Sequence, residues 1–282
     1  MKNKINSCIV VSVLLFSCDK EAKVKLPETE NEPVVIGFLT PEKTKTGINL
    51  WWTDPLYSDN TLDGGMISNA TVSLSDGTSS VNLPYDAVDE YYWVDTSVFV
   101  VSPGNTYTVT VILPDGKQAT ASTLIPVNYV STLTLFQQDL TYSDSSATFW
   151  NVQASGDIEW TDIPSEANYY ALAYYTLLKA PFTGDTIEQF HFQTLLNDAG
   201  RDGLPIRNSF TTSYSYNQGN YTPIGTRVVV ATVNRDYYEY HRTAELGIYS
   251  DPFAEPVLIY SNVTGGVGAL CGYRQKVFDI FY

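Results

Sequence analysis

The chain has 282 residues, of which 31 are Asp or Glu and 16 are Lys or Arg, so its formal net charge is −15. A chain this acidic lacks the clustered basic residues that nucleic-acid binding requires, and this excludes a nucleic-acid partner. Because 44% of the residues are hydrophobic and only 17% are charged, the chain can bury a core and is not a disordered protein.

The first 18 residues have the layout of a bacterial lipoprotein signal. Lys2 and Lys4 give a basic start, the apolar run Ile9–Phe16 follows, and a small residue precedes Cys18. The run is much shorter than the roughly 20 residues of a membrane-spanning helix. We therefore expect 1–17 to be a cleaved signal peptide, and Cys18 to carry palmitate-like acyl chains that hold the mature protein to a membrane. The alternative is an ordinary secretory signal with an incidental cysteine.

Two segments follow the lipidation site. Residues 18–33 are rich in Lys, Glu and Pro, and we interpret them as a lipidated tether. Residues 34–126 contain short apolar runs separated by Pro and Gly turns, which predict an immunoglobulin-like β-sandwich without a disulfide. The strands expected there are Val34–Leu39, Ile48–Trp52, Ala70–Leu74, Tyr91–Val94, Val98–Val101, Thr106–Leu113 and Gln118–Ile125.

Residues 127–282 predict a larger β-rich domain with one or two short helices, so the fold class is mainly β. Capping-box patterns predict helices over Asp185–Leu196 and Asp236–Leu246. The region 201–224 is rich in Asn, Ser, Thr, Gly and Tyr, which indicates an exposed loop or hairpin. The strands expected are Thr132–Phe136, Thr148–Val152, Gly156–Trp160, Asn168–Leu178 and Gly225–Val233.

Three segments carry a resemblance to one family: the hairpin Tyr107–Pro126, the run Arg235–Tyr240 and the closing run Asp251–Gly268. Over nearly its whole mature length, the chain resembles uncharacterised (domain-of-unknown-function) outer-membrane lipoproteins. Their genes commonly lie beside TonB-dependent receptors that carry a carboxypeptidase-regulatory-like domain. The resemblance implies a lipid-anchored location at the outer membrane, on its periplasmic or cell-surface face, with such a receptor as partner. It implies no activity and brings no catalytic residues.

Residue sets for catalysis are missing from the sequence. His191 and His241 are its two histidines, and neither has a second ligand at zinc spacing. No Gly-x-Ser-x-Gly motif occurs. Asp157 and Glu159 share a strand face by simple alternation, which is a weaker basis for a glycosidase pair than for two solvated acids. Cys271 is expected to be a buried, inert thiol. We therefore expect no enzyme and no cofactor.

Two loops are candidates for ligands. The stretch Asp59–Gly65 has oxygen ligands and glycines but lacks the spacing and terminal Glu of an EF-hand, so a solvated loop is favoured. Asp59 and Asp63 are therefore weak calcium candidates, and no other metal site is expected. In the closing run we expect a strand over Val257–Tyr260 and then a turn. Its glycines (Gly265, Gly266 and Gly268) favour a structural turn over a ligand loop.

Tyr214, Tyr216 and Tyr221 alternate with Ser, Asn and Gly, a composition typical of adaptable binding loops. We take these three tyrosines as candidate ligand-binding residues for a glycan or peptide. The function expected is that of a non-catalytic accessory or binding subunit of a TonB-dependent nutrient uptake system. The alternative is a stand-alone surface glycan-binding protein or adhesin. A hydrolase would require acids, or a Ser/His pair, to converge around His241 or Asp157 in a deep cleft.

Overall fold

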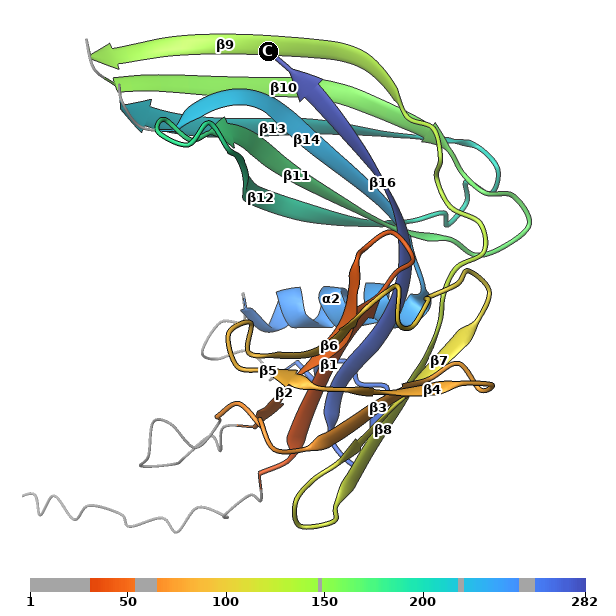
Figure 1. Cartoon of the computed structure of the whole chain (residues 1–282). Helices are drawn as coiled ribbons and strands as arrows, with labels where there is room; N and C mark the ends of the chain where they lie inside the picture. Colours follow the sequence, from red (N-terminus) through yellow and green to blue (C-terminus); the bar gives the residue numbers. More distant parts are fainter. Residues whose placement is uncertain (1–30, 54–64, 147–148, 218–220, 249–256) are drawn as a thin grey trace, which may run out of the picture.

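The computed structural model describes residues 31–53, 65–146, 149–217, 221–248 and 257–282. Within these ranges the fold is mainly β with one helix, α2 (Arg235–Ile248), which confirms the expected fold class (Figure 1). The strands are β1 (Pro33–Leu39), β2 (Lys45–Trp52), β3 (Thr71–Ser75), β4 (Ser80–Leu83), β5 (Tyr85–Asp86), β6 (Tyr91–Asp95), β7 (Thr106–Ile112), β8 (Gln118–Leu124), β9 (Thr134–Ser146), β10 (Phe149–Thr161), β11 (Tyr169–Lys179), β12 (Thr186–Asn197), β13 (Pro205–Asn217), β14 (Thr222–Val233), β15 (Val263–Thr264) and β16 (Val267–Phe281).

The strands form three sheets. The largest has eight strands in the order β12-β11-β14-β16-β1-β2-β6-β5. A five-stranded sheet, β15-β8-β7-β3-β4, faces its β1–β6 end, and a three-stranded sheet, β13-β10-β9, faces its β11–β16 end (Figure 1). Strand pairs within the sheets are antiparallel, except that β1 and β16 run parallel.

Strand β16 connects the two halves of the eight-stranded sheet. The first part of β16, Val267–Gly272, pairs with β1, and its second part, Tyr273–Phe281, pairs with β14. Strand β16 therefore lies between β1 and β14 and makes one continuous sheet of strands from both parts of the chain. The division expected between 126 and 127 stays a prediction.

Each pair of facing sheets encloses its own core. Alternation places Tyr107, Val109 and Val111 of β7 in the core beneath β1 and β2, and all three are fully buried. Around the other core, Tyr170, Leu172 and Tyr174 of β11 face Ile158, Trp160 and Phe210 of the three-stranded sheet. The residues that alternate with this second set point to the opposite face of the eight-stranded sheet, where the helix lies.

Helix α2 confirms the second helix prediction, although its cap lies two residues earlier than the capping box indicated. The side-chain Oδ1 of Asn234 accepts a hydrogen bond from the N–H of Tyr237 at 3.0 Å, which is the usual N-cap geometry. Asp236 then lies in the first turn, where a negative charge is favourable.

The prediction of a helix over Asp185–Leu196 is wrong. The segment forms strand β12, which pairs with β11 along its whole length. Asp185 belongs to the turn between these two strands, where its carbonyl accepts a hydrogen bond from the N–H of Ala180. Phe192 and Leu196 face the core, whereas Leu195 packs on the opposite face beside α2. Pairing with a fully buried neighbouring strand therefore outweighs the local capping signal.

Three further expectations fail. The region 201–224, expected to be an exposed loop or hairpin, is mostly strand β13, which pairs with β10 over its full length. The following strand, β14, belongs to another sheet, so β13 and β14 form no hairpin. The segments Val98–Val101 and Val257–Tyr260 form no strand. In Val98–Val101, Phe99 and Val101 are buried beside β7, whereas Val98 and Val100 are exposed. The alternation therefore comes from two side chains that hold a turn against the core, and not from a strand. The segment 1–17 expected to be a signal peptide, the expected lipidation site Cys18 and most of the expected tether lie outside the described residues, as do the calcium candidates Asp59 and Asp63.

Candidate functional site

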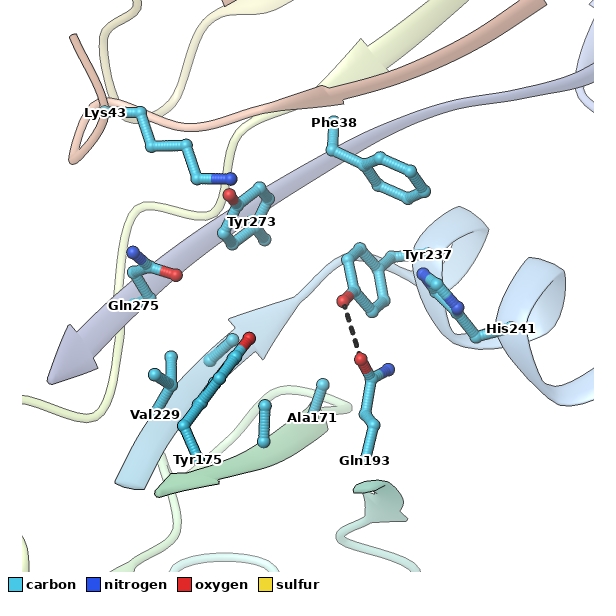
Figure 2. Close-up of a pocket in the computed structure, with 12 residues that line it drawn as sticks. Phe38, Lys43, Ala171, Tyr175, Gln193, Val229, Tyr237, His241, Tyr273 and Gln275 are labelled. Carbon is cyan, nitrogen blue, oxygen red and sulfur yellow. Dashed lines mark hydrogen bonds between the residues drawn. The ribbon is translucent and has the colours of Figure 1, made fainter. Parts of the chain in front are cut away.

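A cleft of about 190 Å³ lies where α2 meets the outer face of the eight-stranded sheet (Figure 2). Its floor consists of small side chains on two adjacent strands. Ala171 of β11 lies opposite Ala231 of β14, and Ala173 lies opposite Val229 in the same register. Because larger side chains surround these four positions, the sheet face is hollowed at this point.

Aromatic rings from four elements form the walls of the cleft. Tyr175 comes from β11, Tyr273 from β16, Phe38 from β1, and Tyr237 and His241 from α2. The ring centroids of Tyr237 and His241 lie 4.4 Å apart, those of Phe38 and His241 5.3 Å, and those of Tyr237 and Tyr273 5.8 Å. Rings in mutual contact have little freedom to move, so the cleft is pre-formed.

The polar groups of the cleft are two amides, three phenols, one amine and the His241 imidazole. The hydroxyl of Tyr237 donates to Oε1 of Gln193 at 3.4 Å, a long hydrogen bond. Gln275 lies on the opposite side, and the Nζ atom of Lys43 lies 5.8 Å from the centroid of the Tyr273 ring (Figure 2). The lining contains no Asp or Glu, although the chain carries 31 acidic residues.

Burial keeps the tyrosine hydroxyls and the histidine ring of the cleft uncharged. Desolvation raises the pKa of Tyr175, Tyr237 and Tyr273, so their hydroxyls stay protonated and can donate hydrogen bonds at neutral pH. Desolvation also lowers the pKa of His241 to about 4, so its ring is neutral. Its Nε2 atom is buried and has no hydrogen-bond partner among the described residues. Lys43 is therefore the one charged side chain in the lining.

Because His241 lies in a cleft, the hydrolase interpretation can be examined directly. The lining contains no Ser, Cys, Asp or Glu that could act with this histidine as nucleophile or orienting acid. Cys271 is buried nearby on β16, as expected, and desolvation raises the pKa of its thiol. Asp157 lies on β10, where it accepts a hydrogen bond from Ser209 at 2.6 Å and pairs with Arg207 at 3.3 Å. These groups do not converge on His241.

The three candidate tyrosines lie together but outside this cleft. The rings of Tyr214 and Tyr216 on β13 are nearly parallel, at 18°, with centroids 6.3 Å apart. Tyr221 precedes β14 and is 41% exposed, and it is close enough to Tyr214 to raise the pKa of that residue, after the larger effect of desolvation. The three residues therefore form one tyrosine cluster, as their spacing suggested.

Sequence reasoning missed most of the cleft. It named His241 only as a histidine without a zinc partner and as a possible centre for a hydrolase, and it did not single out Tyr175, Gln193 or Lys43. The available signal was the alternation of small residues with bulky ones in Tyr169–Leu178 and Thr226–Val233. That signal predicts a cleft only if the two strands are known to pair, because the floor forms where Ala171 lies opposite Ala231.

Sequence reasoning also missed an acidic cluster in the turns beside β11. Carboxylate oxygens of Asp162, Asp198 and Asp202 lie within 4.8 Å of one another, and Asp162 is only 2% exposed. All three accept hydrogen bonds. Asp162 accepts from the hydroxyl of Tyr170 at 2.5 Å, and the other two accept from backbone N–H groups of Asn168 and Ser165. The cluster thereby fastens the turn before β11 to the turn before β13.

A family model described as a domain of unknown function, DUF4249, matches residues 19–278. The chain belongs to this family. The DUF4249 match begins one residue after Cys18 and takes in both sheet pairs, α2 and the cleft. No curated protein matches the chain. Among the described residues, no helix is both long enough and apolar enough to span a bilayer.

Proposed function

We propose that this DUF4249 protein is a non-catalytic lipoprotein, anchored through Cys18 to the periplasmic or cell-surface face of the outer membrane. There it serves as an accessory binding subunit of a TonB-dependent nutrient uptake system. The observation that carries the proposal is the cleft beside α2. Its aromatic walls, amide groups and Lys43 suit the binding of a small molecule, and its lining offers no nucleophile paired with a base. The leader-like start of the chain supports the anchor.

We further propose that strands β1 to β8 form an immunoglobulin-like sandwich, a fold that serves widely as a cell-surface module. Two facing antiparallel sheets support this proposal. So does Tyr107 near the start of β7. Its hydroxyl accepts a hydrogen bond from the N–H of Ser102 at 2.6 Å and lies 3.2 Å from the carbonyl of Val100, to which it donates. This arrangement is similar to the tyrosine corner of such sandwiches.

A contact surface for the receptor is available on β9. This strand is 13 residues long, and within the described sheets it pairs on one side only, with β10. Phe136 and Tyr142 on it are 52% and 57% exposed. An edge strand with free backbone groups and exposed aromatic side chains can accept a strand from another protein. We propose that β9 is the edge through which the receptor is bound.

Co-purification from detergent-solubilised outer membranes tests the accessory role. The tagged full-length protein should retain a TonB-dependent receptor. A Phe136→Lys, Tyr142→Lys double variant should lose it, because charged side chains on an edge oppose pairing. Val88→Lys is the matched control, since Val88 is 91% exposed in the turn between β5 and β6. If no receptor co-purifies with the wild-type protein, the proposed accessory role is wrong. Mass spectrometry of the N-terminal peptide, which should show an acylated Cys18, tests the anchor.

The tyrosine cluster favours a second function, that of a stand-alone glycan-binding protein or adhesin. Tyr214, Tyr216 and Tyr221 offer stacked, partly exposed rings with polar neighbours. A glycan array separates the two functions. Binding that disappears in Tyr214→Ala and Tyr216→Ala variants, with no receptor retained, would favour the adhesin. An array without hits would leave the accessory role as the better account.

A further inference from the structure

We propose that the cleft beside α2 binds a small planar carboxylate, that is, an aromatic or conjugated ring carrying one carboxylate group. This inference rests on the proposed function of the cleft as a ligand-binding site and adds the chemical class of its ligand. Three properties carry it: the size of the cleft, the division of its lining into a polar and an aromatic end, and the charge of Lys43.

The size of the cleft suits a small ligand. Its volume is about 190 Å³. Pockets for drug-sized ligands begin at about 300 Å³. The floor at Ala171, Ala173 and Ala231 lacks long side chains, so a flat group can lie against the sheet between the aromatic walls.

The lining is divided into two ends, as Figure 2 shows. Phe38, Tyr237 and His241 stand together at one end, in mutual ring contact. Lys43 and Gln275 lie at the other end, beside Tyr273. A ligand that satisfies both ends carries its ring toward α2 and its polar group toward Lys43. An inorganic anion would leave the aromatic end without a partner.

The polar end favours a negative charge, because Lys43 is the one charged side chain of the lining and the nearby Glu42 is held by Arg274 and the backbone N–H of Gln275. Among the described residues, Lys43 forms no salt bridge, whereas its neighbour Glu42 is paired with Arg274, whose Nε lies 2.9 Å from Oε1. With no acid in the lining, an ammonium at the rim attracts an anion and repels a cation. The amide of Gln275 and the protonated hydroxyl of Tyr175 add donors for carboxylate oxygens.

The same inventory argues against a sugar as the ligand. Each hydroxyl of a sugar is a donor that needs an acceptor, and carboxylates are the side chains that only accept. The lining holds no carboxylate, and Oε1 of Gln193 already accepts from Tyr237. The acceptors that remain are Oε1 of Gln275, the phenol oxygens and the neutral His241 ring, none of which carries a negative charge. The cleft and the tyrosine cluster are therefore suited to different ligands.

Calorimetric titration of the detergent-solubilised full chain tests the ligand class with three probes: 4-hydroxybenzoate, the uncharged 4-hydroxybenzamide, and glucose. We expect the carboxylate to bind at least about tenfold more tightly than the amide, and glucose not to bind. Lys43→Gln should lower carboxylate affinity to that of the amide and leave amide affinity unchanged. Lys45→Gln is the matched control, because Lys45 is paired with Asp89 and lies over the Trp93 ring, outside the cleft. It should bind all probes as the wild type does.

Equal affinity for the acid and the amide would overturn this ligand class, as would binding of glucose alone or of no probe. An unchanged carboxylate affinity in Lys43→Gln would also overturn it. Receptor retention measured on the same Lys43→Gln variant keeps the two proposals separate. The variant should still retain the receptor, since Lys43 lies outside β9. Failure of the titration therefore leaves the accessory role standing, and failure of the pull-down leaves the ligand class standing.

Discussion

The side-chain amide of Asn262 forms two hydrogen bonds with the backbone of Leu270. Its Nδ2 donates to the Leu270 carbonyl at 2.8 Å, and its Oδ1 accepts from the Leu270 N–H at 2.9 Å. One side chain thereby reproduces the pair of bonds that a neighbouring strand makes in an antiparallel ladder. Leu270 is fully buried, so both backbone groups depend on this side chain, which fastens the segment before β15 to β16.

Replacing Asn262 with Ala should lower the free energy of unfolding by about 2–4 kcal/mol, because two buried backbone groups lose their partner. Asn128→Ala is the control. That side chain bonds Glu166 at an exposed site, and its loss should cost less than about 1 kcal/mol. Urea unfolding of both variants measures the difference. Equal stabilities would show that the Asn262 bonds are replaced by water.

Gly268 of the closing turn should be highly sensitive to substitution. Its φ is +113°, and a Cβ atom there would lie 2.2 Å from the carbonyl oxygen of Val35 on β1. Gly268→Ala should therefore destabilise the protein by at least about 3 kcal/mol, from backbone strain and disruption of the β1–β16 pairing. Gly77→Ala has a comparable φ of +86° with no atom within 4 Å, and should cost about 1–2 kcal/mol. The melting temperatures of the two variants separate the effect of the clash from that of backbone strain. The prediction fails if both variants have the same melting temperature.

The thiol of Cys271 should not react while the protein is folded. It is fully buried, and desolvation raises its pKa, so little thiolate forms. In a chain with Cys8→Ser and Cys18→Ser, iodoacetamide should label Cys271 only at the rate at which the protein unfolds. Adding urea should raise that rate steeply. Labelling in native buffer as fast as in urea would contradict the burial.

His241 should make the fold weaken as the pH falls. Its pKa is lowered by desolvation from 6.5 to about 4, so between these values the unfolded chain binds more protons than the folded one. The free energy of unfolding is therefore unaffected by this residue above pH 6.5. It falls progressively toward pH 4, by about 2 kcal/mol between pH 7 and pH 4.5.

His241→Phe should reduce this pH dependence, since a phenyl ring retains the stacking on Phe38 and does not titrate. The measurement is the urea midpoint of wild type and variant at pH 7 and pH 4.5. His191→Gln serves as the second histidine control, because desolvation lowers its pKa in the same direction. If His241→Phe and the wild type lose the same stability over this range, the titrating group lies elsewhere.

The sequence supported those elements whose evidence is local. The alternation in Thr106–Leu113 and the turn Pro114–Lys117 predicted the β7–β8 hairpin, because a side-chain period of two and a tight turn follow from the residues themselves. Helix α2 was predicted from its local start signal. The same reasoning failed at β12, where the capping pattern of Asp185–Glu188 was overruled by pairing with β11.

By itself, the sequence determined that this protein is mainly β, that it is strongly acidic, and that Cys271 is a buried thiol. These properties depend on composition and on the period of neighbouring side chains. The tertiary structure alone decided that β16 joins both ends of one sheet, and that Ala171 meets Ala231 beneath Tyr237 and His241. The physical reason is that strand order and register arise from contacts between segments far apart in the chain, which no local pattern encodes.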